Sequence, residues 1–337
     1  MPDYKPKNIL VTGGAGFIGS NYIRYRLNHH SQNKIINLDK LTYAGSMDNL
    51  IGLQAKSGYV FIQGDICDAP LVNSILQQHA IDTVVHFAAE SHVDRSIEGP
   101  GEFVQTNILG TFTLLEAARA YWCQSRRLDS NRCRFHHIST DEVFGTLDQH
   151  SPAFSETTAY APNSPYSSTK AGSDYLVRAW HKTYGLPVTI SHCSNNYGPY
   201  QYREKFIPTV VHACLNQTKI PIYGDGSNIR DWLYVEDHCT AVDAVIRKGE
   251  IGEAYNIGGL NEWSNLDICQ LICERMDQRV PDQAPHSKLI QFVADRPGHD
   301  WRYAIDSSKI VANLGWAPQQ TFQTGIAKTL DWIMGTA

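Results

Sequence analysis

Residues 8–19 read NILVTGGAGFIG, in which a short apolar run is followed by glycines spaced three apart. The apolar run predicts a buried β-strand, and a helical pattern begins at Phe17. Gly13, Gly16 and Gly19 permit a tight turn and a close approach of phosphate oxygens to the backbone N–H groups at the helix start. The segment therefore predicts a dinucleotide site, although an ordinary strand–helix turn has the same outline.

The end of the second predicted strand indicates which dinucleotide is bound. Asp39 closes that strand twenty residues after Gly19. A carboxylate at this position accepts hydrogen bonds from ribose hydroxyls and repels a 2′-phosphate, so the sequence predicts NAD rather than NADP. Asp65 and Ile66 after the third strand, and residues 87–90 after the fourth, are expected to flank the adenine and its ribose.

The first half of the 337-residue chain alternates short apolar runs with longer amphipathic ones, which is typical of βαβ units. Strands are predicted at 8–11, 34–38, 59–63, 83–87, 134–138 and 187–192, and helices at 17–29, 70–78, 101–122 and 166–184. Right-handed crossovers then give an α/β fold with a Rossmann-type doubly wound parallel sheet.

The pattern changes after about residue 194, where mixed segments rich in Pro, Gly and Tyr begin. We expect a Rossmann domain over residues 1–194 that carries the catalytic residues. Residues 195–337 are expected to form a smaller, C-terminal substrate-binding lobe, with some segments returning to the Rossmann sheet. Such a lobe would cover the carboxyl edge of the sheet, where folds of this kind bind ligands.

Composition argues against several other classes of protein. Charged residues make up 19% of the chain and the formal net charge is −5, whereas nucleic-acid and anionic-membrane surfaces need a basic excess. No apolar run resembles a signal peptide or a membrane span. The eight cysteines contain no CxxC pair, so reduced thiols of a cytoplasmic protein are expected. Cys269 and Cys273 stand four apart in a helical pattern, which favours a packed helix face over a metal site.

Tyr166 and Lys170 stand four residues apart in the segment YSSTK, which places them on one face of a predicted helix. A nearby ammonium stabilises a phenolate, so the pair predicts a lowered pKa for Tyr166 and a role as general base. Lys170 is also expected to hydrogen-bond the nicotinamide ribose. The alternative is a surface pair beside a core aromatic, and the glycine motif makes the catalytic interpretation the stronger one.

Thr140, Asp141 and Glu142 directly follow an apolar strand, at the carboxyl edge of the predicted sheet. Two adjacent carboxyl groups can have different pKa values and divide acid and base work between them. Thr and Asp also cap helices well, so a helix start explains the same residues. The chemistry of these residues leaves the two interpretations evenly matched.

The chain resembles the dTDP-glucose 4,6-dehydratase family of extended short-chain dehydrogenases. The resemblance rests on sequence blocks that lie in order between residues 11 and 306: TGGAGFIGS, DKLTYAG, AAESHVDRS, STDEVFG, YSSTK, SNNYGPY, EKFIP, GDGSNIRDWLYVEDH, YNIGGLNE and DRPGHDWRYAID. It implies an NAD-dependent hydro-lyase of nucleotide-sugar metabolism that acts on dTDP-glucose. The product would feed deoxysugar biosynthesis, such as that of dTDP-rhamnose.

The resemblance also implies the mechanism. Tyr166 would remove the 4-hydroxyl proton while a hydride leaves C4 for NAD, and Thr140 would hydrogen-bond the sugar and polarise the 4-position. Glu142 would then remove the C5 proton as Asp141 protonates the departing 6-hydroxyl. Return of the hydride to C6 would complete a turnover without net use of NAD. A simple epimerase would have no need of the acid and base at 141 and 142.

Further binding residues are implied by the same resemblance. The cofactor set comprises Gly13, Gly16, Phe17, Ile18, Gly19, Asp39, Lys40, Leu41, Thr42, Asp65, Ile66, Phe87, Ala88, Ala89, Ser91, Thr106, Tyr166, Lys170 and Asn196. The substrate set comprises Ser91, Thr140, Asn195, Lys205, Phe206, Pro221, Ile222, Tyr223, Arg230, Asn265, Asp295, Arg296, Pro297, Gly298 and His299. The fixed guanidinium forks of Arg230 and Arg296 suit phosphate oxygens, with an ordinary salt bridge as the alternative.

Two positions depart from the family pattern. Phe144 stands where the family usually has Tyr, and Phe206 where it usually has Leu, which puts the base preference in doubt. The family also suggests a homodimer in which helices 101–122 and 166–184 pair into a four-helix interface. Alternative functions are a UDP-glucose 4,6-dehydratase, a UDP-sugar 4-epimerase and a catalytically silent NAD-binding regulator.

Overall fold

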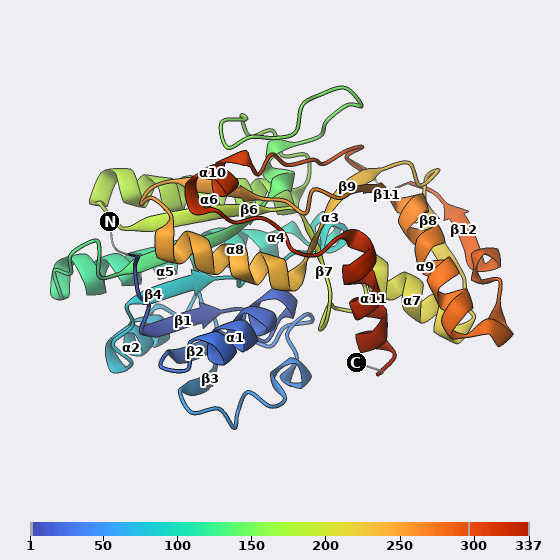
Figure 1. Ribbon diagram of the computed structural model, residues 1–337. Coiled ribbons are helices and arrows are strands. Elements are labelled where there is room, and N and C mark those ends of the chain that lie inside the picture. The colour runs from blue at the N-terminus through green and yellow to red at the C-terminus, as the bar shows by residue number, and fades with distance from the viewer. Residues whose placement is uncertain (1–2, 296, 336–337) are drawn as a thin grey trace.

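The computed structural model describes residues 3–295 and 297–335 and places a seven-stranded sheet at the centre of the larger lobe (Figure 1). The strand order is β10-β6-β5-β4-β1-β2-β3, and every pairing in this sheet is parallel. This is the doubly wound arrangement that the sequence predicts. The strands are β1 (Asn8–Thr12), β2 (Lys34–Asp39), β3 (Tyr59–Gln63), β4 (Thr83–His86), β5 (Arg134–Thr140), β6 (Val188–Cys193) and β10 (Ala254–Ile257).

Helices cover both faces of this sheet because successive side chains of each strand point to opposite faces. Ile9 and Val11 of β1 join one apolar cluster, while Leu10 between them joins the other. The first cluster is completed by α1 (Phe17–His29), α8 (Val235–Lys248) and α10 (Ser308–Leu314). The second contains α2 (Ala69–Gln78), α5 (Thr111–Ala118) and α6 (Pro165–Tyr184).

The segment expected as one helix over 101–122 has a mixed geometry. It consists of α4 (Pro100–Phe103), the π-helical η2 (Val104–Gly110), α5 and the π-helical η3 (Arg119–Ser125). A π-helical turn widens the helix to i→i+5 hydrogen bonds, and apolar spacing does not distinguish it from an α-helical turn. The prediction therefore located the helical segment but not its internal geometry. The short α3 (Val93–Glu98) precedes it.

The smaller lobe has its own apolar core. Its strands are β7 (Asn195–Tyr197), β8 (Ile220–Tyr223), β9 (Ile229–Tyr234), β11 (Glu262–Ser264) and β12 (Ile290–Val293), and its helices are α7 (Phe206–Asn216), α9 (Asn265–Arg279) and α11 (Phe322–Ile333). Cys269 and Cys273 are buried on α9 in this core, which confirms the packed helix face. The remaining short 3₁₀ turns are η1 (Met47–Leu50), η4 (Asp141–Phe144), η5 (Pro281–Gln283) and η6 (His286–Leu289).

The chain passes between the lobes more than once. Strand β10 follows β7, β8 and β9 along the chain, yet it pairs with β6 at the edge of the seven-stranded sheet. Helices α8 and α10 likewise pack on that sheet (Figure 1). The second half of the sequence therefore supplies both the smaller lobe and one edge of the larger one.

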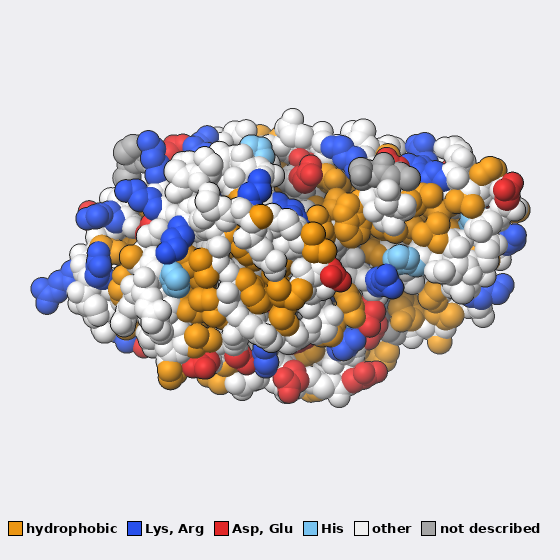
Figure 2. All heavy atoms as spheres, turned by 90° about the horizontal axis from the view of Figure 1, so that it is seen from below, with side chains coloured by type: hydrophobic (Ala, Val, Ile, Leu, Met, Phe, Trp, Pro, Cys, Tyr) orange, Lys and Arg blue, Asp and Glu red, His pale blue; other side chains and the backbone are white. Residues whose placement is uncertain are grey.

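The surface seen from below in Figure 1 mixes charges of both signs. Figure 2 shows hydrophobic side chains gathered over the middle of this face, with Lys, Arg, Asp and Glu distributed around them. Within the described ranges, no helix is both long enough and apolar enough to cross a membrane.

Candidate active site

A cavity of about 550 Å³ lies where the carboxyl ends of the central strands face the smaller lobe. Its lining comes from the turns that follow β1, β2, β4, β5 and β6 and from α6. The smaller lobe adds residues of α7, β8, β9 and α9. Ligands bind at this place in open α/β sheets, because the turns after parallel strands meet there.

The glycine turn after β1 forms one wall of the cavity. Gly13 has a φ of +72°, and a Cβ there would lie 2.6 Å from the backbone nitrogen of Ala88. A Cβ at Gly19 would lie 2.3 Å from the carbonyl oxygen of Gly13. Gly16 is the N-cap of α1 and provides no side-chain cap, so the N–H groups of the first turn remain available to an anion. This geometry fits the pyrophosphate of a dinucleotide.

Asp39, at the end of β2, holds the glycine turn in place. Its Oδ2 accepts a hydrogen bond from the backbone nitrogen of Ala15 at 2.8 Å, and its Oδ1 accepts one from that of Leu41 at 2.8 Å. A carboxylate has room for further donors, so the same side chain fits ribose hydroxyls. Burial raises the pKa of Asp39, and the two backbone N–H groups oppose that rise. Next to it, Lys40 forms an ion pair with Asp65 at 2.9 Å.

Helix α6 carries the Tyr–Lys pair, and its start is fixed by local sequence. Ser164 caps the helix through the backbone nitrogen of Ser167, with Pro165 in the first turn. One turn later, Tyr166 and Lys170 are both buried and both line the cavity. The Lys170 ammonium donates a hydrogen bond to the carbonyl oxygen of Ile138 at 2.7 Å, which fixes its nitrogen beside β5.

The pKa of Tyr166 differs from the expected lowering. Burial raises it well above its ordinary value, Glu142 adds to the rise, and the hydroxyl of Thr140 opposes it. Burial lowers the pKa of Lys170 to about 8, and the negative charge of Asp174 opposes that change. Spacing along a helix predicted that the cation and the phenol lie together, but it could not show how far burial disfavours the phenolate.

In the turn after β5, Thr140, Asp141 and Glu142 both begin a helix and line the cavity, so the two interpretations left open by the sequence apply together. Thr140 caps the short helix η4, since its hydroxyl accepts a hydrogen bond from the backbone nitrogen of Glu142 at 3.3 Å. Thr140, Asp141 and Glu142 also line the cavity. Asp141 is buried whereas Glu142 is half-buried. Burial raises the pKa of Asp141 well above its ordinary value, and Glu142 adds to the rise. Asp141 therefore suits an acid that holds its proton.

The structure brings most of the predicted residues to this cavity. All five residues expected to be catalytic line it, as do the expected cofactor residues apart from Leu41. On the substrate side, Asp295, Pro297 and Gly298 lie outside the lining, and Arg296 falls outside the described residues. The Oδ1 atom of Asp295 instead lies within hydrogen-bond distance of Nδ1 of His299, at 2.6 Å. His299 itself does line the cavity.

Arg230 lies at the substrate end of the cavity, where it contacts backbone carbonyl groups and an aromatic ring. Its guanidinium donates to the carbonyl oxygens of Ile229 at 2.7 Å and Asp300 at 2.8 Å. It also lies over the ring of Tyr303, 4.2 Å from the ring centre. The expected phosphate contact is therefore compatible with the position of Arg230, and backbone carbonyls orient the side chain.

Several cavity residues were missed by the sequence reasoning. They include His92, Cys193, Gln201, Tyr202 and Tyr303. Most come from irregular segments that lack the period of a helix or strand, so only their place beside quoted blocks such as AAESHVDRS could have identified them. Among the residues that the structure describes, no group of His, Cys, Asp and Glu is arranged to hold a metal ion.

The parallel sheet, the glycine turn and the buried Tyr–Lys pair define an NAD-binding enzyme of the extended short-chain dehydrogenase class. Residues 10–329 match the sequence profile of the family described as GDP-mannose 4,6 dehydratase. The chain belongs to this family of sugar-nucleotide dehydratases.

Known proteins similar to the chain include both dehydratases and epimerases. The dTDP-glucose 4,6-dehydratase 1 of Escherichia coli is 54% identical over 97% of this chain and 92% of its own length. A dTDP-glucose 4,6-dehydratase of Streptomyces venezuelae, solved with NAD bound, is 43% identical with a TM-score of 0.88 and 97% of each chain covered. The UDP-glucose 4-epimerase of Thermotoga maritima shares the fold at a TM-score of 0.86 and 27% identity, covering 98% of this chain and 99% of its own.

Proposed function

We propose that this chain is a dTDP-glucose 4,6-dehydratase, a hydro-lyase that converts dTDP-glucose into dTDP-4-keto-6-deoxyglucose and water. The observation that supports it best is the carboxyl pair Asp141–Glu142, which lines the same cavity as Tyr166 and Lys170. The high identity to curated dehydratases over nearly the whole chain supports the same substrate.

Each of the cavity's catalytic side chains has a distinct role in the dehydration. When bound, NAD would supply the hydride acceptor for C4 and the hydride donor for C6, and C5 takes up a proton as C6 is reduced. Tyr166 takes the proton of the 4-hydroxyl, aided by the Lys170 ammonium and the hydroxyl of Thr140. The resulting 4-keto group acidifies the C5 hydrogen, which Glu142 removes. Asp141, which burial keeps protonated, gives its proton to the departing 6-hydroxyl.

A 4-epimerase needs the Tyr–Lys pair but no elimination acid and base. The buried, proton-holding Asp141 next to the half-buried Glu142 therefore favours a dehydratase over an epimerase. The presence of both the carboxyl pair and the Tyr–Lys pair in one cavity also argues against a silent NAD-binding regulator, which would need neither pair. Dehydration of UDP-glucose stays an alternative, because Phe206 at the substrate end of the cavity bears on base choice.

Incubation of the purified chain with dTDP-glucose or UDP-glucose, followed by mass analysis, tests this proposal. We expect loss of one water from dTDP-glucose without added NAD, because the cofactor is retained and recycled. Recovery of a product with the mass of the substrate and an inverted C4 would instead identify an epimerase. Faster loss of water from UDP-glucose would reassign the base.

We further propose that two copies pair through the exposed side of the helices at 100–125 and α6. These helices pack together and still expose large apolar side chains, namely Val104, Leu109, Phe112, Tyr175 and Tyr184. Exposed apolar side chains on neighbouring helices are typical of protein interfaces. The eight free cysteines support a cytoplasmic location.

A further inference from the structure

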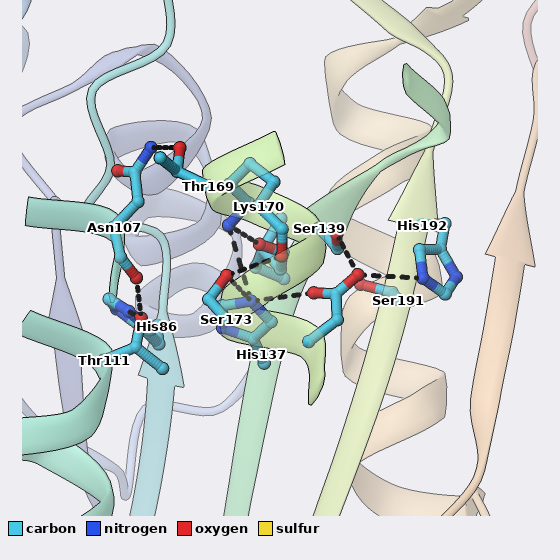
Figure 3. Close-up of polar contacts among 12 residues, drawn as sticks. His86, Asn107, Thr111, His137, Ser139, Thr169, Lys170, Ser173, Ser191 and His192 are labelled. Atoms are coloured by element: carbon cyan, nitrogen blue, oxygen red, sulfur yellow. Dashed lines mark hydrogen bonds and ion pairs between the residues drawn. The ribbon is translucent and has the colours of Figure 1, made fainter. Parts of the chain in front are cut away.

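Behind Lys170, away from the cavity, lies a buried polar network that the reaction as described does not use. It is centred on Asp174, one turn further along α6, and on His137 of β5 and His192 of β6. Figure 3 shows Lys170 on the side of His137, with His192 farther away on β6. Buried polar groups are costly unless each has a partner, so a network of this size calls for an explanation.

His137 stands between Lys170 and Asp174. Its Nε2 is 3.4 Å from the Lys170 nitrogen and 3.1 Å from Oδ1 of Asp174 (Figure 3). Burial lowers the pKa of His137 to about 4, and the charge of Lys170 adds to the lowering. The imidazole is therefore neutral at neutral pH. One ring nitrogen, Nε2, therefore lies between the ammonium of Lys170 and the carboxylate of Asp174.

Asp174 is held as an anion. Its Oδ2 accepts hydrogen bonds from the hydroxyls of Ser139 at 2.7 Å and Tyr160 at 3.0 Å. Burial alone would raise the pKa of Asp174, but hydrogen bonds from His137 and His192 hold it well below its ordinary value. The carboxylate therefore supplies one full negative charge inside the protein, on the far side of His137 from Lys170.

Burial favours the neutral form of several other titratable groups around Lys170 and Asp174. The pKa of His86 on β4 lies well below its ordinary value, and those of Cys193 and Tyr160 are raised by burial. Burial also raises the pKa of Asp141 on η4, which keeps that acid protonated. Titratable or charged groups face the network from β4, β5, β6, η4, the segment before α6 and α6 itself. They are His86, His136, His137, His192, Cys193, Asp141, Glu142, Tyr160, Tyr166, Tyr175 and Arg178.

We propose that Asp174 is a positioning residue that acts through His137 to keep the Lys170 side chain an ammonium ion in its buried place. The proposal rests on the proposed function for its catalytic consequence, because the reaction needs the Lys170 charge beside Tyr166. A buried ammonium with no anion nearby loses its proton readily. The Asp174 charge opposes this loss, and the His137 ring holds charge and countercharge at a fixed separation.

The first test measures the charge of Lys170 directly, without any substrate. Holoenzyme labelled with ¹³C-lysine is titrated by NMR, and the Lys170 signal is assigned by its loss in Lys170→Met. In Asp174→Asn the pKa of Lys170 is expected to fall by about one or more, a tenfold or greater loss of proton affinity. His192→Asn is the matched control, since it removes a neighbour of the same carboxylate but leaves the charge.

The second test uses the pH profile of dehydration. Loss of the countercharge lowers the pKa of Lys170, so the ammonium disappears at lower pH. The alkaline limb of kcat should therefore move to lower pH in Asp174→Asn and stay in place in His192→Asn. If Asp174→Asn does not fold, Asp174→Ser removes the same charge with a smaller side chain and should give the same two shifts.

A folded Asp174→Asn or Asp174→Ser with an unshifted Lys170 titration overturns the proposal, even where activity is lost, because the network would then be only structural. A wild-type chain that titrates as expected but does not dehydrate dTDP-glucose would overturn the proposed function and leave the link between Asp174 and Lys170 standing.

Discussion

Asp141 and Glu142 are neighbours in the chain but lie in different surroundings. Asp141 is buried, and its raised pKa keeps a proton on the carboxyl group, whereas Glu142 is half-buried at the cavity wall. Two carboxyl groups thus acquire different roles, chiefly through their different burial. This contrast suits a reaction that needs an acid and a base at adjacent carbon atoms.

Glu142→Gln should separate binding from elimination. The amide keeps the size of the side chain but cannot accept a proton, so we expect unchanged NAD content and a kcat lowered about 100-fold or more. Mass analysis of the sugar nucleotide recovered from D₂O should show no deuterium at C5. Glu204→Gln, which changes another carboxyl group that lines the cavity, is the control and should retain turnover. Normal turnover in Glu142→Gln would remove this residue from the mechanism.

Single residues with local signatures were predictable from the sequence. The glycine turn, Asp39 and the Tyr–Lys pair each depend on neighbours within one strand–turn–helix or one helical turn, and all of them line the cavity. The link from Lys170 through His137 to Asp174 joins β5 to the second and third turns of α6 and is set by the packing of α6 on the sheet. No spacing in the sequence predicts such a contact, and the same holds for the raised pKa of Tyr166.

At the scale of elements, the strand–turn–helix around α1 holds the cofactor only if its glycines remain. Gly19→Ala would place a Cβ 2.3 Å from the carbonyl oxygen of Gly13, so the helix start must move away from the turn. We expect loss of NAD, seen by absorbance of the purified protein, and a stability lower by roughly 1–3 kcal/mol in denaturant unfolding. Gly99→Ala is the control, because its Cβ meets only ordinary contacts. Full NAD content in Gly19→Ala would contradict this account.

The positions of the elements followed well from the sequence. The six strands predicted in the first half lie within two residues of their observed ends, because each is a short apolar run bounded by Gly, Pro or a polar residue. The short strands of the smaller lobe were not individually predicted. They pair with partners far along the chain, such as β12 with β8, so local pattern alone did not identify them.

At the scale of the whole molecule, the proposed pairing of two copies depends on the exposed apolar side chains along 100–125 and α6. If Leu109 and Phe112 were replaced by charged residues, the new charges would be buried in this interface without partners. We expect Leu109→Glu combined with Phe112→Glu to convert a dimer into a monomer in analytical ultracentrifugation. Phe292→Glu, at an exposed apolar side chain of β12, should leave the dimer intact. A wild-type chain that sediments as a monomer would contradict the pairing.

The late arrival of β10 at the sheet has a consequence for synthesis on the ribosome. The first six strands emerge in sequence, but the open edge of β6 has no partner until residues 254–257 leave the exit tunnel. An unpaired strand edge is a template for joining another chain. The nascent protein therefore leaves this strand edge open while β7, α7, β8, β9 and α8 are being translated. The speed of that stretch sets how long neighbouring chains can capture it.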